Sequence, residues 1–395
     1  MNFCPLRTEV HLNISWIRKI IETGENNMTL TNYWWLLIWL FVGGGILAYA
    51  VPKQKVNVLG QYENRWRVIP ALILALPYAV WAGFRGDGFG DTSAYRFMFE
   101  TAPSSFSELL TTLTGNGKDK GFTVLTTLFK ITFGNSDVMF FLLIAIFQIL
   151  CIAFIYRKYS TDYWLSFFLF IVSTDYMSWM FNGIRQFIAA AGFLACFGLL
   201  IKKKYGLLIC MILLLSTIHA SVLIMLPIIF VIQGKAWNRR TILFILAIGI
   251  VIVFVDQFTP FLDNILSETQ YSDIVTNDLW TSDDGTSILR ILVYSVPAIL
   301  SLIGKKYIDE ANDPVINICT NASACTMILY ALAGVSSGIY IGRLPIYTTL
   351  IGYIALPWMV NNMFTKQSTK IIKIAMIIVY VLFFYYQMHI TWHML

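Results

Sequence analysis

The sequence contains little charge and no closely spaced cysteine pair, and each absence narrows what the protein can be. Only 13% of the 395 residues are charged, whereas 57% are hydrophobic. A soluble fold of this length does not need so much apolar surface, so the composition favours a polytopic membrane protein. The six cysteines form no C-x-x-C pair, so there is no thiol-based metal or redox motif. No cleavable signal peptide is apparent either.

Apolar runs of roughly the length that crosses a membrane, about 20 residues, recur along the chain. They lie at 33–51, 68–84, 137–156, 162–180, 184–201, 241–257, 288–303, 316–338, 344–362 and 371–391. The sequence therefore predicts an all-α polytopic membrane protein with about ten full spans. A further run, 206–232, carries His219 near its middle.

Clusters of Lys and Arg between the runs indicate the orientation. They occur at 53–67, 157–158, 202–204, 235–240, 305–306 and 366–373. The positive-inside rule places all of them in the cytoplasm, and they do not form a nucleic acid-binding surface. Because the clusters on either side of the run 206–232 are both cytoplasmic, this run must enter and leave the membrane on the cytoplasmic side. We therefore predict a broken-helix hairpin with His219 near its tip, which gives about twelve hydrophobic segments in all.

The polar stretches divide the chain into two parts. Residues 1–30 are predicted to form a polar or interfacial N-terminal segment, and 31–395 a single transmembrane helical domain. Within that domain, 85–136 and 256–287 are too polar to be buried and are expected to be outer loops. In the first loop, residues 121–134 are amphipathic and predict a helix along the outer interface.

Arginines at the predicted outer ends of four different helices are the strongest functional signal. They are Arg85, Arg185, Arg290 and Arg343, and His219 is predicted at the same level. A guanidinium keeps its charge when desolvated and offers a fork of donors that matches phosphate. Because equal numbers of carboxylates are not near them in sequence, we expect a ligand to neutralise them. At an outer membrane face, that ligand is a lipid-linked phosphate or pyrophosphate.

Plainer interpretations exist for the same residues. An arginine at a helix end often extends to the lipid headgroups, and a lone histidine is more often a hydrogen-bonded core residue than a catalyst. Three i, i+4 pairs share a helix face, namely Asp91/Tyr95, Arg290/Tyr294 and Arg343/Tyr347. Interfacial aromatic belts explain these tyrosines about as well as sugar stacking does.

Two apparent motifs carry little weight. Glycines 86, 88 and 90 give a partial glycine-rich pattern, but no strand precedes them, so a dinucleotide loop is not expected. Asp283-Asp284 is similar to a metal-binding D-x-D, yet it lies in a generally acidic loop. No metal site is predicted.

The segments FNGIRQFIAAA and KKKYGLLICMILLLSTIHASVLIMLP resemble the N-x-I-R-Q, K-K and H-x-S signature of EpsG-like, Wzy-type polysaccharide polymerases. An earlier element of that family, an arginine followed by D-x-x-x-Y, is matched by Arg85, Asp91 and Tyr95. A late R-x-x-x-Y is matched by Arg343 and Tyr347. The resemblance spans roughly residues 30–362 in the same order.

The resemblance implies a lipid-donor glycosyltransferase of the GT-C type, without metal or cofactor, in the bacterial cytoplasmic (inner) membrane. Its active site would face the periplasm. Such enzymes polymerise undecaprenyl-pyrophosphate-linked oligosaccharide repeat units into O-antigen or exopolysaccharide, using one unit as donor and the next as acceptor. Membrane lipids, a chain-length regulator and a flippase would be its partners, and nucleic acid would not. The alternatives are a lipid-linked oligosaccharide flippase or exporter and an O-antigen ligase.

The resemblance also distributes roles among the candidate residues. The base would be His219 or Asp91, with His219 preferred. The pyrophosphate would bind Arg185 and Arg343, supported by Arg85 and Arg290. Asn182 and Gln186 would orient sugar or phosphate oxygens, and Tyr95 and Tyr347 would stack on sugars.

Overall fold

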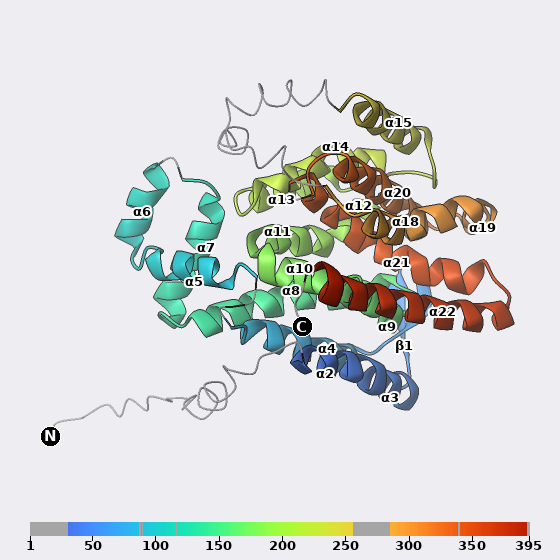
Figure 1. The fold of residues 1–395 in the computed structure, drawn as a ribbon, viewed down its shortest axis with the longest axis horizontal. Helices are drawn as coiled ribbons and strands as arrows, with labels where there is room; N and C mark the ends of the chain where they lie inside the picture. Colours follow the sequence, from blue (N-terminus) through green and yellow to red (C-terminus); the bar gives the residue numbers. More distant parts are fainter. Residues whose placement is uncertain are drawn as a thin grey trace.

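The computed structural model describes residues 31–255 and 285–392, apart from the single positions 87, 89, 116 and 339. The predicted N-terminal segment over 1–30 and most of the loop over 256–287, including Asp283 and Asp284, lie outside the described residues. Within the described ranges the chain is almost entirely helical (Figure 1).

The helices and strands follow one another with short connections. The first part comprises α2 (Thr31–Ile38), η1 (Trp39–Gly43), α3 (Gly44–Ala50), β1 (Gln54–Val58), β2 (Gln61–Arg65), α4 (Val68–Gly83), α5 (Thr92–Thr101), α6 (Phe106–Thr114), α7 (Lys120–Phe133) and α8 (Asp137–Tyr159). The middle part comprises α9 (Tyr163–Val172), α10 (Asp175–Asn182), α11 (Ile184–Ala195), α12 (Phe197–Ile201), α13 (Tyr205–Ser216), η2 (Ala220–Ile224), α14 (Met225–Val231) and α15 (Arg239–Val253). The last part comprises α18 (Ile288–Ile303), α19 (Lys305–Ala311), α20 (Pro314–Gly334), η3 (Ile341–Arg343), α21 (Ile346–Asn362), α22 (Lys366–Tyr385) and η4 (Tyr386–Thr391).

The long apolar helices are those of a membrane protein. Among the described residues, α8, α20 and the continuous helix Lys366–Thr391 are each long and apolar enough to cross a bilayer. Up to five spans result if two bent pairs, α9 with α10 and α18 with α19, each count as one. The remaining apolar helices have 10–17 residues, so the number of about ten full spans stays a prediction.

The run 162–180, predicted as one span, is broken. Helix α9 ends at Val172, Thr174 adopts a left-handed conformation with φ of 77°, and α10 leaves at an angle of 62°. A threonine rarely takes this conformation, because its branched side chain crowds the backbone there. The break places Asp175 in the first turn of α10, where its charge suits the helix dipole.

The predicted hairpin over 206–232 is present. Helix α13 runs up to Ser216, a turn carries His219, and η2 and α14 return. The ring of Tyr205, at the start of α13, lies 5.0 Å from that of Phe230, near the end of α14. Because the two ends of the segment meet, the chain must reverse direction at His219.

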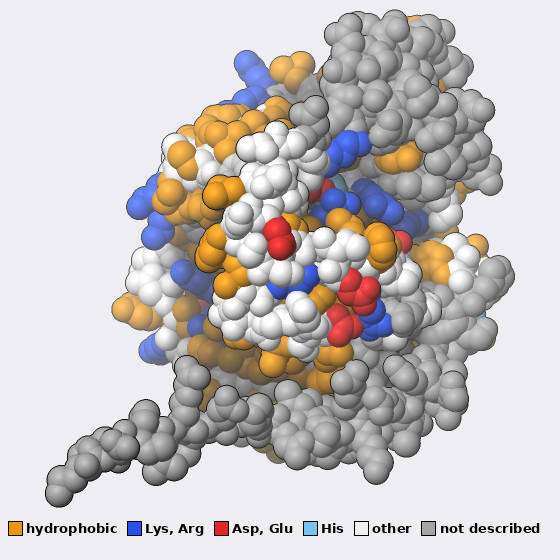
Figure 2. Space-filling view, turned by 90° about the vertical axis from the view of Figure 1, so that its left-hand side faces the viewer, with side chains coloured by type: hydrophobic (Ala, Val, Ile, Leu, Met, Phe, Trp, Pro, Cys, Tyr) orange, Lys and Arg blue, Asp and Glu red, His pale blue; other side chains and the backbone are white. Residues whose placement is uncertain are grey.

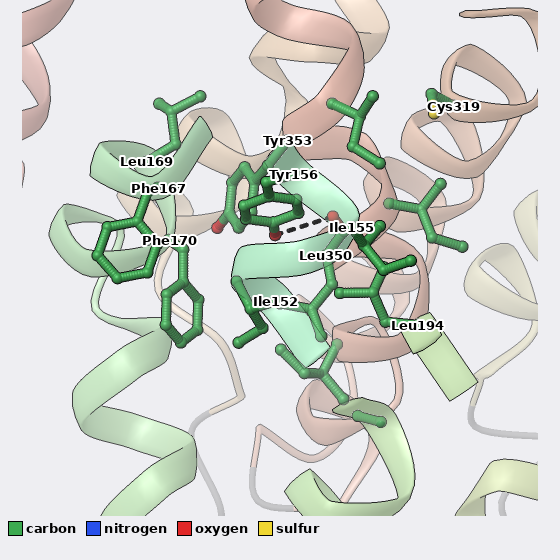
Figure 3. Packing of buried hydrophobic residues seen from close by; sticks show 14 of the residues in the cluster. Ile152, Ile155, Tyr156, Phe167, Leu169, Phe170, Leu194, Cys319, Leu350 and Tyr353 are labelled. Atoms are coloured by element: carbon green, nitrogen blue, oxygen red, sulfur yellow. Dashed lines mark hydrogen bonds between the residues drawn. The ribbon is translucent and has the colours of Figure 1, made fainter. Parts of the chain in front are cut away.

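Buried tyrosines join helices that are distant in sequence. Tyr156 of α8 donates a hydrogen bond of 3.0 Å to the carbonyl of Leu350 on α21, within the packed interior shown in Figure 3. Tyr163 of α9 likewise donates to the carbonyl of Ala71 on α4. A buried hydroxyl without a partner is costly, so these bonds fix which helices pack together.

Helices α5, α6 and α7, which we call the lobe, lie at one end of the bundle, and the β1–β2 hairpin and α19 lie at the other (Figure 1). Helix α7 confirms the helix predicted over 121–134. Helix α4 connects the two ends and crosses α8 closely, since a Cβ on Gly83 would lie 2.7 Å from the Leu142 Cα. The β-hairpin, which the sequence pattern did not indicate, turns through Leu59 and Gly60, both with positive φ as a tight two-residue turn requires.

Candidate functional site

His219 lies in the turn between α13 and η2, outside both helices, and is held by a hydrogen-bonded chain. Its Nδ1 lies 2.7 Å from the Ser221 hydroxyl, which in turn lies 2.7 Å from the Tyr347 hydroxyl on α21. Tyr347 is only 1% exposed, so it provides a rigid anchor. The orientation of the His219 ring is therefore set by a helix more than a hundred residues away.

The environment of His219 favours the neutral imidazole. Burial, followed by the positive charges of Arg185 and Arg343, lowers the pKa of His219 from 6.5 to about 4. Two of the predicted arginines thus act on the predicted histidine from different helices. A neutral imidazole at pH 7 can accept a proton.

Arg185 has a partner that the sequence did not predict. It lies in the first turn of α11, and its Nη1 is 2.5 Å from the Asp119 carboxylate at the start of α7. The expectation that this arginine lacks a carboxylate is therefore wrong, because Asp119 is distant in sequence but adjacent in the fold. Burial raises the pKa of Asp119 although Arg185 acts in the opposite direction. Desolvation of the carboxylate thus exceeds the attraction between the two charges.

Arg343, at the end of η3, is exposed and forms no ion pair with any other described residue. Its backbone carbonyl accepts a hydrogen bond of 2.9 Å from Gln186 Nε2 on α11. Gln186 is 3% exposed, so its amide holds η3 against α11. This geometry indicates that Gln186 positions Arg343, whereas the resemblance implied that it orients sugar or phosphate oxygens directly.

Arg85 is buried where the end of α4 meets α10. It is 5% exposed, and its guanidinium donates to the carbonyls of Ala82 and Met180. The group also lies over the rings of Phe141 and Phe181, at 4.9 and 4.6 Å from their centroids. Burial lowers the pKa of Arg85 to about 9. These contacts tie the end of α4 to α10, which favours a structural role over direct binding of phosphate.

The loop before α5 closes on the end of α10. The Asp91 backbone N–H donates to the Phe181 carbonyl, and a Cβ on Gly90 would meet the Asn182 side chain at 1.9 Å. Gly90 has φ of 58°, so a glycine is needed here for both conformation and space. Asp91 itself is exposed, and none of the described residues pairs with its carboxylate.

The two predicted sugar-stacking tyrosines are buried. Tyr95 is 7% exposed, and its ring centroid lies 5.9 Å from the Arg185 guanidinium carbon. Tyr347 is engaged with Ser221 as described above. The expectation that these two rings present their faces to a sugar is therefore wrong, because both are packed in the interior.

Arg290 belongs to a second polar centre. It is half-buried and lies over the rings of Tyr294 and Tyr330, at 5.6 and 5.9 Å from their centroids. Its charge acts on Asp175, whose carboxylate accepts hydrogen bonds from Tyr294 and Tyr353 at 2.6 and 2.5 Å. The sequence analysis missed Asp175. A lone acid inside an apolar run was the signal that could have found it.

We call His219, Arg185, Arg343 and Asp119 the head site. Figure 2 views the molecule from the lobe end and shows Lys and Arg side chains gathered in a recess on this face, with acidic side chains near them. Arg185 stands in the first turn of α11, so the helix dipole adds to its attraction for anions. No group of three or more His, Cys, Asp or Glu side chains that could hold a metal occurs within the described ranges.

Comparison with known protein families matches residues 68–393 to the EpsG family. The chain belongs to the EpsG family. Comparison with curated proteins and with solved structures gave no match. Membership of the EpsG family supports a membrane function of the polysaccharide-polymerase type, with a glycosyltransferase-like role. The EpsG match includes both the head site and the Asp175–Arg290 centre.

Proposed function

We propose that the protein polymerises undecaprenyl-pyrophosphate-linked oligosaccharide repeat units at the outer face of the cytoplasmic membrane. The observation that carries this proposal is the placement of Arg185 and Arg343 around a neutral His219 in a member of the EpsG family. Two cations and one acid leave the head site with a net positive charge, which suits a pyrophosphate.

The reaction requires a base and stabilisation of the leaving group. The Ser221 backbone N–H lies 3.4 Å from His219 Nδ1 and the Ser221 hydroxyl only 2.7 Å, so the base is the tautomer in which Nδ1–H donates to that closer hydroxyl. In this tautomer Nε2 is free to take the proton of an acceptor sugar hydroxyl. The hydroxyl oxygen then forms a bond to the anomeric carbon of the donor as the bond to the pyrophosphate oxygen breaks. Arg343 and Arg185 stabilise the charge that develops on undecaprenyl pyrophosphate as it leaves.

Asp91 is the second candidate for the base, because its side chain is exposed in the loop that closes on the end of α10. Substitution of the residue that acts as the base should affect kcat far more than substitution of the other candidate. Replacing the true base should lower kcat about 100-fold or more with little change in donor binding. His219→Ala and Asp91→Asn, measured in parallel, distinguish them.

The test of the function is polymerisation by the purified full chain, reconstituted in liposomes with undecaprenyl-pyrophosphate-linked repeat units. We expect a ladder of products on a gel with the wild type and single repeats with Arg185→Ala. Arg96→Ala is the matched control, since Arg96 of α5 forms a comparable partly buried pair with Asp137 of α8 and is not part of the head site. A normal ladder from Arg185→Ala would refute the site.

A deletion strain adds a test against the alternatives. A polymerase deletion should leave surface glycan with single repeats. Loss of all surface glycan, with repeat units trapped inside, would identify a flippase instead. Full ladders that remain attached to the lipid carrier would identify a ligase.

A further inference from the structure

An apolar groove begins beside the head site. It has a volume of about 430 Å³ and lies between α7, α8, α11 and the end of α13. Of its lining residues, Thr132 alone has a polar side chain, and that hydroxyl donates to the carbonyl of Leu128. The groove therefore presents no unsatisfied polar group, and its size is in the range of ligand sites, about 300–1,000 Å³.

One end of the groove adjoins the charged groups. Ile188 lines the groove one turn after Arg185 on the same face of α11, and Ile218 lines it immediately before His219. Helix α7 forms one wall, and the residue before it, Asp119, is the partner of Arg185. The groove therefore adjoins the head site at Ile188 and Ile218.

The other end of the groove opens outward. Leu128, Phe133 and Phe147 line it and are 45%, 56% and 42% exposed, whereas Ile188 is 3% exposed. The distance along α7 from Leu125 to Phe133 is about 12 Å at helical rise. The lining therefore extends from buried residues beside the head site to exposed apolar residues at the surface.

We propose that this groove holds the first isoprenoid units of the polyprenyl chain whose pyrophosphate lies at Arg185 and Arg343. The inference rests on the proposed function and adds the binding site of the lipid tail. Charge complementarity selects the occupant, since an apolar groove that ends at a net positive site fits an apolar chain that ends in an anion. Burial of the chain contributes affinity in proportion to its apolar area.

The test uses purified full chain in detergent and two probes, inorganic pyrophosphate and farnesyl diphosphate. The wild type should bind farnesyl diphosphate at least about tenfold more tightly than pyrophosphate, because only the former has a tail to bury. Leu128→Trp should fill the groove and abolish that difference, with pyrophosphate binding unchanged. Ile131→Trp is the control, since Ile131 lies on the same helix, is 39% exposed and does not line the groove.

A second pair of variants, on α8, tests the groove independently if the α7 variants fail to fold. Phe147 and Phe154 of α8 are both 42% exposed, and only Phe147 lines the groove. Phe147→Trp should weaken farnesyl diphosphate binding, and Phe154→Trp should not. Equal effects of groove and control variants, or a tail that adds no affinity, would refute the groove.

The outcomes also separate the two proposals. If pyrophosphate does not bind, or binds equally well to Arg343→Gln, the proposed head site fails. If pyrophosphate binds as expected but phosphatidylglycerol displaces farnesyl diphosphate at equal concentration, the groove takes ordinary bilayer lipid and the tail proposal fails.

Discussion

Replacing Asp119 by asparagine tests whether a bound phosphate takes the place of the Asp119 carboxylate beside Arg185. In the described structure the Asp119 carboxylate lies 2.5 Å from Arg185 Nη1, with the two side chains 15% and 28% exposed. A phosphate that binds Arg185 must displace this carboxylate. Asp119→Asn removes the competitor and should therefore tighten the binding of pyrophosphate.

The size of the effect follows from the balance of attraction and desolvation. Two charges 4 Å apart attract by about 4 kcal/mol at an effective dielectric constant of 20, but measured surface pairs contribute about 0.2–1 kcal/mol. The raised pKa of Asp119 shows that desolvation outweighs the attraction of Arg185. We therefore take the upper surface value, about 1 kcal/mol, which corresponds to about fivefold tighter binding.

The same pKa shift determines the effect on stability. An acid whose pKa is raised on folding contributes stability at low pH and loses it as pH rises through the folded pKa. At neutral pH the desolvation of the charged Asp119 therefore offsets what its pairing with Arg185 contributes to stability, and Asp119→Asn should change the melting temperature little.

Isothermal titration of full chain with pyrophosphate gives the affinity. Asp137→Asn is the control, because Asp137 pairs with Arg96 at 2.6 Å in a second partly buried ion pair, with the two side chains 30% and 24% exposed. Unchanged or weaker binding by a well-folded Asp119→Asn variant, or an equal gain from Asp137→Asn, would refute the exchange.

Three further outcomes are expected. Ser221→Ala breaks the link between His219 and α21, so kcat should fall roughly tenfold while the dissociation constant of pyrophosphate stays the same. Because the pKa of His219 is lowered to about 4 by burial and then by the two arginines, the acid limb of the rate profile should lie well below pH 6.5, and Arg343→Gln should shift it upward. Asp175→Asn removes a buried charge that faces Arg290, and chemical denaturation should show a loss of about 3 kcal/mol.

The apolar runs predicted a mostly helical membrane protein, because the hydrophobicity of a segment can be read from its own residues. The number of spans stays a prediction. Placing all basic clusters on one side of the membrane also predicted that the chain reverses direction at His219. The contact of Tyr205 with Phe230 confirms this reversal. The break at Thr174 was not predictable in this way. An apolar run continues through it, and the bend depends on partners of Asp175 on α18 and α21.

Pairing of charges was the least predictable feature of the site. Asp119, the partner of Arg185, and Asp175, on which the charge of Arg290 acts, are each far in sequence from the arginine concerned, so no local window contains both residues. The burial of Tyr347 could not be predicted either. An i, i+4 spacing shows that two residues lie on the same face of a helix, but not what packs against that face.

The internal pairing has a physical reason that connects stability with function. A partly buried guanidinium without a counter-charge would destabilise the fold whenever the substrate is absent. A carboxylate that is itself poorly solvated, as Asp119 is, reduces that cost yet remains easy to displace. Arg343 needs no such partner, because it is exposed to solvent. In the proposed reaction both arginines would bind the same anion, but only Arg185 would exchange a carboxylate for a phosphate.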